Sequence, residues 1–495
     1  MYLSKSLYTR GLQCVKSLWL KKYNKAVLTK LDASQQAIFT TGDKVGKLAC
    51  TLFPKGKEIS YDNTSFDEKI KLTKKYLAKE IENIYEATFS YQNILIMVDI
   101  LHVNKDGSVE INEVKSSTEV KEVYLHDASI QFYVLNGLGY EVKKVNIIHI
   151  NNAYIRDKEL KVEKLFSIVN VSEQMKEMQD DIPSYLKRFK GYLEQKEDEP
   201  DIDIGKQCFN PYECDCYEYC WKEQREIPNY SIFNISRLKI DKKFELYKEG
   251  ILHTTDIKDI SLYSTSQQVQ ILSDKKQESI VNKVAIKEFL DTLTYPLYHL
   301  DFETFQQAIP EWEWIRPYMQ IPFQYSLHIE HKDGTLGHKE FLAQEGDDPR
   351  YELAKRLTRD IPSYVTVLAY NMGFEKGVIR RLAETYPDLH VKLMSIHDNI
   401  KDLMTPFQNK YYYEPSMQGS YSIKKVLPAL VPEMEQAYKE LNLIHHGGEA
   451  MQTYANLVNM DEDTKQEYKK ALLEYCKLDT LAMVKVLEKL KESVR

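Results

Sequence analysis

Acidic residues with catalytic spacing occur in the last part of the chain. Asp301 and Glu303 stand two residues apart in a predicted strand, so both carboxylates should lie on one face of it. Tyr475 and Asp479 stand four apart in a predicted helix and share one side. Glu375 begins another predicted helix between them. Carboxylates from separate elements can hold divalent cations for phosphodiester hydrolysis. Each segment taken singly is also compatible with a core element that carries stray acidic residues.

The order of these residues resembles the motifs of the DnaQ-like, or DEDD, 3′–5′ exonucleases. The D-x-E motif is followed by Tyr370-Asn371-x-x-Phe374-Glu375 and then by Y-x-x-x-D. The resemblance implies an RNase H-like domain in which Asp301, Glu303 and Asp479 bind two Mg²⁺ or Mn²⁺ ions. It implies that Glu375, where an Asp is usual, holds the outer ion. Tyr475 would orient the attacking water and marks the tyrosine-type subgroup.

A second group of charged residues lies on a predicted strand hairpin covering residues 94–103 and 107–117. Asp99 is on the first strand, and Glu113 and Lys115 share one face of the second, with Val114 on the other. An Asp and a Glu on neighbouring strands can hold a divalent cation, and the Lys can contact a phosphate or a water. A surface hairpin with scattered charges is the alternative, because E-x-K is very common.

This second group resembles the PD-(D/E)xK nucleases of the RecB-like family, with a restriction-endonuclease-like α/β core. The resemblance implies metal binding by Asp99, Glu113 and an upstream glutamate matched by Glu86, and catalytic roles for Asp99, Glu113, Lys115 and Gln131, with Tyr133 nearby. The family often has a metal-binding His early in the domain. Gly46 occupies that position here, so the ligand is either missing or supplied by Asp43.

Cysteines are concentrated in one short segment, at Cys208, Cys214, Cys216 and Cys220. We see no apolar secretory region in the first residues, so clustered thiols favour a metal site over disulfides. These four thiolates could surround a tetrahedral zinc ion without help from the rest of the chain.

The iron–sulfur subgroup of RecB-like nucleases, with CRISPR-associated and AddB-type members, suggests another ligand set. In that subgroup one cysteine lies near the N-terminus and three follow the nuclease core. The resemblance implies a [4Fe–4S] cluster with Cys216 as a bystander and with these ligands: Cys14, Cys208, Cys214 and Cys220. Spacing does not decide between the cluster and zinc. Cys50 and Cys476 lie in helical patterns and are expected to be small core residues.

The elements that position these groups predict a multidomain α/β protein. We expect a RecB-like nuclease with its cysteine staple over residues 1–225, a helical linker over 226–288, and a DnaQ-like domain over 289–495. The linker contains Leu246, Gly250, Ile251 and Asp256, which suit either a helix-hairpin-helix or an ordinary helix end. Lys424 and Lys425 follow an aromatic loop that could contact nucleic acid or pack over the exonuclease sheet. His445 to Gly448 form either a metal site or a polar turn.

The composition is ordinary for a globular protein, and we expect a cytoplasmic location. The net charge of -7 neither indicates nor excludes nucleic-acid binding, because active-site carboxylates contribute to it. No apolar run approaches the roughly 18 residues of a membrane span. We therefore expect a metal-dependent nuclease that acts on DNA ends or single-stranded DNA in repair, defence or CRISPR-associated processing. The alternative is a nucleic-acid-binding module with a decayed first site and an exonuclease that trims RNA.

Overall fold

The computed structural model describes residues 3–30, 32–60 and 64–495. The chain forms two compact units, and the mixed α/β, multidomain architecture is confirmed. The first unit contains the residues up to Glu226 together with Gln307–Met319, and the second contains Ile227–Gln306 and Gln320–Arg495. Among the described residues, no helix combines the length and apolar character needed to cross a bilayer.

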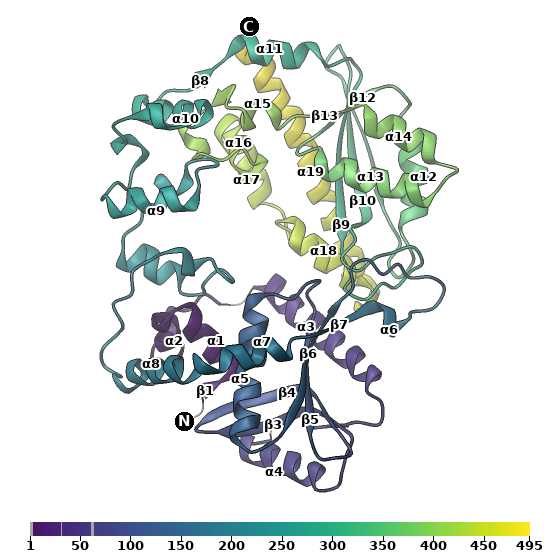
Figure 1. Ribbon diagram of the computed structural model, residues 1–495. Helices are drawn as coiled ribbons and strands as arrows, with labels where there is room; N and C mark the ends of the chain where they lie inside the picture. Colours follow the sequence, from purple (N-terminus) through teal and green to yellow (C-terminus); the bar gives the residue numbers. More distant parts are fainter. Residues whose placement is uncertain (1–2, 31, 61–63) are drawn as a thin grey trace. The chain divides into compact units, whose positions relative to one another are not determined.

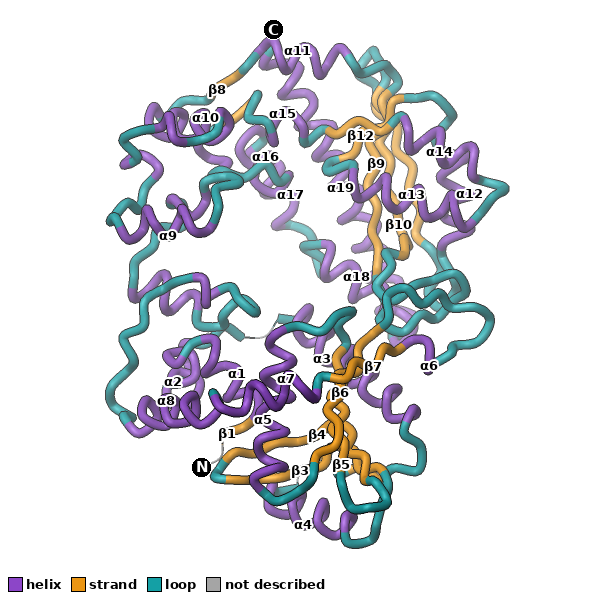
Figure 2. Tube along the Cα trace, in the orientation of Figure 1, coloured by secondary structure: helices purple, strands orange, loops and turns teal. Residues whose placement is uncertain are grey.

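A mixed sheet forms the centre of the first unit (Figure 2). Its strands are β1 (Leu3–Ser4), β2 (Lys57–Glu58), β3 (Asn83–Tyr91), β4 (Ile94–Val103), β5 (Val109–Lys115), β6 (Val142–Ile150) and β7 (Phe166–Asn170). The order is β2-β3-β4-β5-β6-β7, with β1 parallel to β4. Strands β3, β4 and β5 are antiparallel neighbours, so the predicted hairpin is confirmed, whereas β5 and β6 are parallel.

Helices of the first unit cover both faces of this sheet. They are α1 (Lys5–Gln13), α2 (Val15–Tyr23), α3 (Ala33–Ala49), α4 (Phe66–Leu77), α5 (Glu122–Gly137), α6 (Val162–Leu165), α7 (Ser172–Glu177) and α8 (Ile182–Glu194). One apolar cluster joins α5 to the sheet through Ala128 and Ile130. Another joins α3 through Val45 and includes Val114. Val114 and the α5-facing Glu113 thus lie on opposite faces of β5, as predicted.

The second unit contains a sheet of order β11-β10-β9-β12-β13 and a small β8–β14 pair. The strands are β8 (Ile280–Val281), β9 (Leu297–Phe305), β10 (Ile321–Glu330), β11 (Leu336–Leu342), β12 (Thr366–Ala369), β13 (Ile400–Asp402) and β14 (Tyr412–Tyr413). Strand β9 is antiparallel to β10 and parallel to β12. Nearly all of its side chains are buried, and the polar His299 and Glu303 are among them.

Some helices of the second unit cover the two faces of this sheet, and those of residues 240–276 lie away from it (Figure 1). They are α9 (Ile240–Lys248), α10 (Thr265–Lys276), α11 (Lys283–Asp291), α12 (Arg350–Asp360), α13 (Gly373–Thr385), α14 (His390–Asp398), α15 (Thr405–Gln408), α16 (Ile423–Leu430), α17 (Pro432–Lys439), α18 (Gly447–Asn456) and α19 (Glu462–Ser493). Helices α12, α13 and α14 pack on the Leu300 face of β9. Helix α19 packs on the opposite face, which carries Asp301 and Glu303.

Two segments differ from the predicted domain plan. Residues 227–288 do not form a unit of their own but belong to the second unit, where the Tyr230 hydroxyl hydrogen-bonds the Asp274 carboxylate and lies 3.2 Å from the Tyr413 hydroxyl. Residues 307–319, expected in the C-terminal domain, belong to the first unit. The guanidinium of Arg156 donates to the Pro310 carbonyl at 2.6 Å. Such long-range contacts leave no signal in local periodicity.

Candidate functional site

Three carboxylates of the second unit converge where β9 meets α19. Asp301 and Glu303 project from the same face of β9, and Asp479 projects from α19, so that one oxygen of each lies within 4.8 Å of the others. The sulfur of Cys476, also on α19, lies 3.8 Å from the Asp301 carboxylate. Cys476 is buried, as predicted, but it also borders the acidic group, a contact that the sequence did not indicate.

The pKa values of these carboxyl groups are raised, so their ionised forms are disfavoured in the absence of a cation. Burial, together with the charge of Asp479, raises the pKa of Glu303 to about 8. The same two causes raise the pKa of Asp301, and burial raises that of Asp479 to about 6. Attraction by Lys424 opposes the shifts of Glu303 and Asp479 without cancelling them. A site with this charge imbalance favours an additional cation.

Glu375 lies at the start of α13, as predicted, and is 2% exposed. Burial raises its pKa to about 8, and the charge of Asp402 adds to the shift. Its Oε2 atom is buried and has no hydrogen-bond partner among the described residues. A carboxylate oxygen in this state is suited to a cation or a bound water. Neighbouring Asn371 follows β12 with a φ of 75°, and its backbone N–H donates to Asp402 at 3.0 Å.

Two tyrosines contact Asp479. The Tyr475 hydroxyl hydrogen-bonds to Asp479 from the same helix, as the spacing of four suggested. The Tyr438 hydroxyl of α17 donates to Asp479 Oδ1 at 2.6 Å. Sequence reasoning missed Tyr438, because it stands 41 positions away in a different helix. Both hydroxyl pKa values are raised by burial first and by the nearby carboxylates second.

The segment between α17 and α18 also approaches this site. A Cβ atom on Gly447 would lie 3.3 Å from Glu303 Oε2, so glycine permits close contact between the start of α18 and the carboxylate. His446 accepts a hydrogen bond from the Glu449 N–H at 3.2 Å, and the His445 N–H donates to the Glu449 side chain at 2.8 Å. The two histidines thus form the polar turn that caps α18.

In the first unit the strand register aligns the predicted carboxylates. Tyr85 pairs with Ile100 and Ala87 with Val98, which sets Glu86 opposite Asp99. Glu86 has a φ of 56°, an uncommon conformation for a residue other than glycine. On the other side of β4, Asp99 Oδ2 accepts a hydrogen bond from the Val114 N–H at 2.7 Å. The three predicted metal ligands of this site thus lie on adjacent strands.

Glu113 is held by donors from three elements. Its Oε1 accepts from Lys5 of α1 at 2.8 Å and from Lys115 at 2.7 Å, and its Oε2 accepts from Gln131 of α5 at 2.7 Å. Lys115 also donates to Asp127 of α5 at 2.6 Å. Neither Lys5 nor Asp127 was a sequence candidate. Asp127 precedes Gln131 by one helical turn, so the spacing of four could have indicated it.

The charges of the first site are unevenly compensated. Burial, opposed by Lys115 and Lys5 with greater combined effect, leaves the pKa of Glu113 well below its usual range. Burial and the Glu113 charge instead raise the pKa of Asp99 to about 6, and burial and Asp99 raise that of Glu86 to about 7. Cys50, expected in the core, is only partly buried. Burial followed by the charges of Asp99 and Glu86 raises its pKa to about 12.

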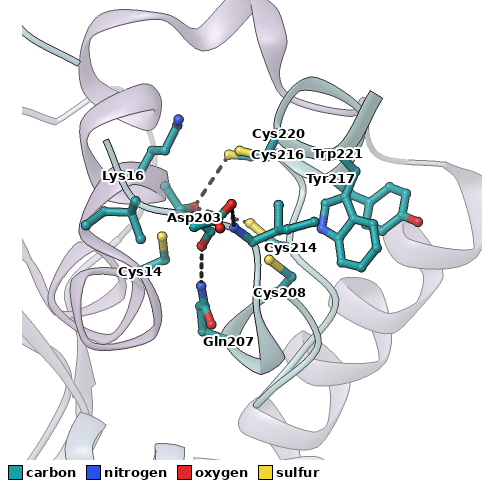
Figure 3. A pocket seen from close by; sticks show the side chains of 13 residues that line it. Cys14, Lys16, Asp203, Gln207, Cys208, Cys214, Cys216, Tyr217, Cys220 and Trp221 are labelled. Atoms are coloured by element: carbon teal, nitrogen blue, oxygen red, sulfur yellow. Dashed lines mark hydrogen bonds between the residues drawn. The ribbon is translucent and has the colours of Figure 1, made fainter. Parts of the chain in front are cut away.

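Five cysteines surround one pocket of the first unit (Figure 3). They are Cys14, Cys208, Cys214, Cys216 and Cys220, and Lys16, Ser17 and Trp221 also line the pocket. Tertiary structure therefore brings Cys14 from the α1–α2 junction to the cysteine-rich segment. Burial raises the pKa values of Cys14, Cys208 and Cys220, and the charge of Cys214 adds to each.

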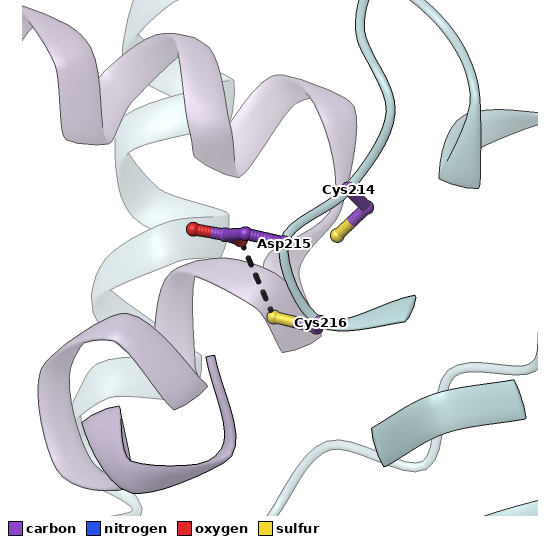
Figure 4. Close-up of side chains that lie close together, drawn as sticks. All are labelled: Cys214, Asp215 and Cys216. Carbon is purple, nitrogen blue, oxygen red and sulfur yellow. Dashed lines mark hydrogen bonds between the residues drawn. The ribbon is translucent and has the colours of Figure 1, made fainter. Parts of the chain in front are cut away.

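The Cys216 thiol lies beside the Asp215 carboxylate, with its sulfur 3.7 Å from Oδ1 (Figure 4). A hydrogen bond with Cys216 lowers the pKa of Cys214 to about 6, while this bond and burial raise the pKa of Cys216. One ligand atom each of Cys214, Asp215 and Cys216 lies within 4.8 Å of the others. The Asp215 carboxylate is, however, already paired with both terminal nitrogens of Arg10, at 2.7 and 2.8 Å. The Cys216 thiol itself donates to Ser17 Oγ at 3.6 Å and to Asp215 Oδ1 at 3.7 Å.

Two weaker sequence candidates have structural explanations. Gly250, with a φ of 77°, ends α9 by donating to the Tyr247 carbonyl at 3.0 Å, and the next element is the short 3₁₀ turn Thr254–Asp256. This geometry is that of an ordinary helix end. Lys424 and Lys425 are both exposed at the start of α16, and Lys425 donates to Gln418 at 2.9 Å.

Comparison with known proteins identifies relatives without a described activity. Residues 298–422 match the family model "Domain of unknown function (DUF2779)". This match includes Asp301, Glu303 and Glu375 but ends before Tyr475 and Asp479. The chain is 25% identical over 288 residues to "Uncharacterized protein UU173" of Ureaplasma parvum serovar 3. The similar region covers 54% of this chain and 41% of that protein, so it spans less than half of the relative.

Proposed function

We propose that the second unit is a metal-dependent phosphodiesterase, a 3′–5′ exonuclease of the DEDD tyrosine type. The observation that carries the proposal is the convergence of Asp301, Glu303 and Asp479 within 4.8 Å. Hard carboxylate oxygens are the ligands that Mg²⁺ and Mn²⁺ prefer. Burial raises the pKa values of Glu303 and Asp479, and a bound cation would favour their ionised forms.

The chain's own residues can be assigned roles at this site. Asp301, Glu303 and Asp479 would hold divalent ions, and the unpartnered Oε2 of Glu375 would hold an outer ion or its water. Bound ions of this kind lower the pKa of water and stabilise the charge that develops on a phosphate. The Tyr475 hydroxyl would orient the attacking water, and Tyr438 would fix the Asp479 carboxylate through its 2.6 Å hydrogen bond.

Nucleic acid is the substrate class that fits the neighbouring surface. Lys424 is exposed and acts electrostatically on Glu303 and Asp479, so its ammonium can contact a phosphate next to the reacting one. A contact to the 2′-hydroxyl would separate RNA substrates from DNA substrates. We propose DNA ends or single-stranded DNA as substrate, with RNA trimming as the alternative.

A digest panel tests this function. Labelled single-stranded DNA, double-stranded DNA and RNA are each incubated with Mg²⁺, Mn²⁺ or EDTA, using the wild type, Asp301→Asn and a control. The control is Asp463→Asn, which alters an exposed carboxylate in the first turn of α19. We expect stepwise release of nucleotides from 3′ ends, lost in EDTA and reduced at least about a thousandfold in Asp301→Asn. Unchanged release by Asp301→Asn would refute the assignment.

For the first unit we propose a second, PD-(D/E)xK-type nuclease site. Its support is the alignment of Glu86, Asp99 and Glu113 on adjacent strands and the position of Lys115 beside Glu113. The alternative, a binding module, is favoured by Gly46. This residue lies on α3 and offers no ligand at the position of the family's histidine.

We also propose that the first unit binds a [4Fe–4S] cluster through Cys14, Cys208, Cys214 and Cys220. The donor set fits, because these thiols line one pocket and Cys14 is among them. Zinc on Cys208, Cys214, Cys216 and Cys220 is the alternative, although the Cys216 thiol is directed to Ser17 and Asp215. Anaerobic purification followed by iron, sulfide and zinc analysis distinguishes the two. We also propose a cytoplasmic location, where thiols stay reduced and available to a metal or a cluster.

A further inference from the structure

The ammonium of Lys5 lies among the carboxylates of the first site. Its Nζ is 2.8 Å from Glu113 Oε1, 3.5 Å from Asp99 Oδ1 and 3.9 Å from Asp127 Oδ2. Asp99 and Glu113 are the two residues that would bridge a divalent ion at this site. Lys5 thus lies where such an ion would find its ligands.

The start of the chain fixes Lys5 at this position. Leu3 and Ser4 pair in parallel with Ile94 and Leu95 of β4, the strand that carries Asp99. Ser4 is also the N-cap of α1, and its hydroxyl accepts a hydrogen bond from the Leu7 N–H at 3.3 Å. Lys5 is the first residue of this helix, so strand pairing and the helix cap together direct it toward the carboxylates.

The oxygens that a divalent ion needs are already engaged. Glu113 Oε1 accepts from Lys5 and Lys115, and its Oε2 accepts from Gln131. Asp99 Oδ2 accepts from the Val114 N–H, and its Oδ1 faces Lys5. A divalent ion binds carboxylate oxygens at about 2.0–2.6 Å. An ion on Asp99 and Glu113 would therefore lie within a few ångströms of the Lys5 ammonium and repel it strongly.

We propose that Lys5 is the resident cation of the first site, and that a divalent ion occupies Asp99 and Glu113 only by displacing its ammonium. The acidic group of the second unit differs in this respect, because Lys424 lowers the pKa values of Glu303 and Asp479 only in part and they remain raised. Lys5 is thereby a competitor that sets how much metal the first site requires.

Mn²⁺ binding to the full-length chain tests this inference. The second site is first disabled by Asp301→Asn with Asp479→Asn, and Mn²⁺ is then titrated by calorimetry and by electron paramagnetic resonance of the free ion. Adding Lys5→Met should tighten Mn²⁺ binding at least tenfold. Lys5→Arg, which keeps the positive charge, and Lys74→Met, which alters an exposed lysine of α4, should leave it unchanged. Glu113→Gln added to Lys5→Met should remove the gain.

A second variant guards against misfolding of Lys5→Met. In Lys5→Met with Asp127→Asn, loss of one carboxylate offsets the lost ammonium, while Asp99 and Glu113 stay available. If neither folded variant, judged by circular dichroism, binds Mn²⁺ more tightly than its Lys5 parent, the inference is wrong. It is equally wrong if Lys5→Arg gains as much affinity as Lys5→Met. Because binding is the measurement, a chain that digests no nucleic acid could still gain affinity, which separates this inference from the proposed exonuclease.

Discussion

Substitution of Glu375 by Gln should stabilise the metal-free protein in a pH-dependent way. Glu375 is 2% exposed, and its Oε2 has no partner among the described residues. Burial and then the charge of Asp402 raise its pKa from 4.5 to about 8. The folded protein therefore holds this proton more tightly than the unfolded chain, in which the carboxyl ionises at its ordinary pKa.

The sign and size of the effect follow from linkage between protonation and folding. Because the folded-state pKa is raised, the contribution of Glu375 to stability is fully present below pH 4.5 and is lost as the pH rises toward about 8. One pKa unit corresponds to about 1.4 kcal/mol, so the loss reaches about 3 kcal/mol at pH 7 and stays below about 1 kcal/mol at pH 5. A glutamine cannot ionise and avoids this loss.

Urea unfolding in EDTA provides the assay, followed by far-ultraviolet circular dichroism at pH 5 and pH 7. All four tryptophans (Trp19, Trp221, Trp312 and Trp314) belong to the first unit, so their fluorescence monitors the unit that is not mutated. Glu375→Gln should be more stable than the wild type at pH 7, and nearly equal to it at pH 5. Glu384→Gln, an exposed change on the same helix, is the matched control.

Metal should reverse the order of stabilities. Mn²⁺ should stabilise the wild type more than Glu375→Gln, because the variant offers a weaker ligand. Glu375→Asp keeps a carboxylate, so its exonuclease activity should fall less than that of Glu375→Gln. A stability gain for Glu375→Gln that is equal at both pH values, or absent at pH 7, would show that the buried charge is not the cause.

Three further outcomes are expected. Glu113→Ala and Lys115→Ala should leave the exonuclease activity unchanged but remove any separate endonucleolytic or 5′-end product. If no product changes on any substrate, the first unit is better described as a binding module. A [4Fe–4S] protein should absorb broadly at about 400 nm, and Cys14→Ser should bleach this absorption while Cys216→Ser nearly preserves it. A colourless wild type that carries zinc after anaerobic purification would contradict the cluster. Tyr438→Phe removes a hydrogen bond that lowers the pKa of Asp479. The acidic limb of the pH–rate profile should therefore move to higher pH, and an unmoved limb would exclude this positioning role.

Local pattern in the sequence was sufficient to predict which side chains share a face. The period of two in β9 puts Asp301 and Glu303 together, and the spacing of four in α19 puts Tyr475 beside Asp479. The hairpin of β4 and β5 and the opposite faces of Glu113 and Val114 were predictable for the same reason. These features depend on backbone geometry, which repeats along each element and can be read without knowing the rest of the chain.

Only the tertiary structure decided which distant side chains complete each group. Lys5 reaches Glu113 across 108 positions, and Tyr438 reaches Asp479 across 41. Cysteine spacing alone could not decide whether Cys14 joins the metal ligands. Packing of the α1–α2 junction places it in the same pocket as Cys208. Such pairings arise because apolar faces such as those of α5 and α19 must be buried against sheets formed elsewhere in the chain. The contacts brought by that burial depend on how whole elements pack, and no period within a single element records them.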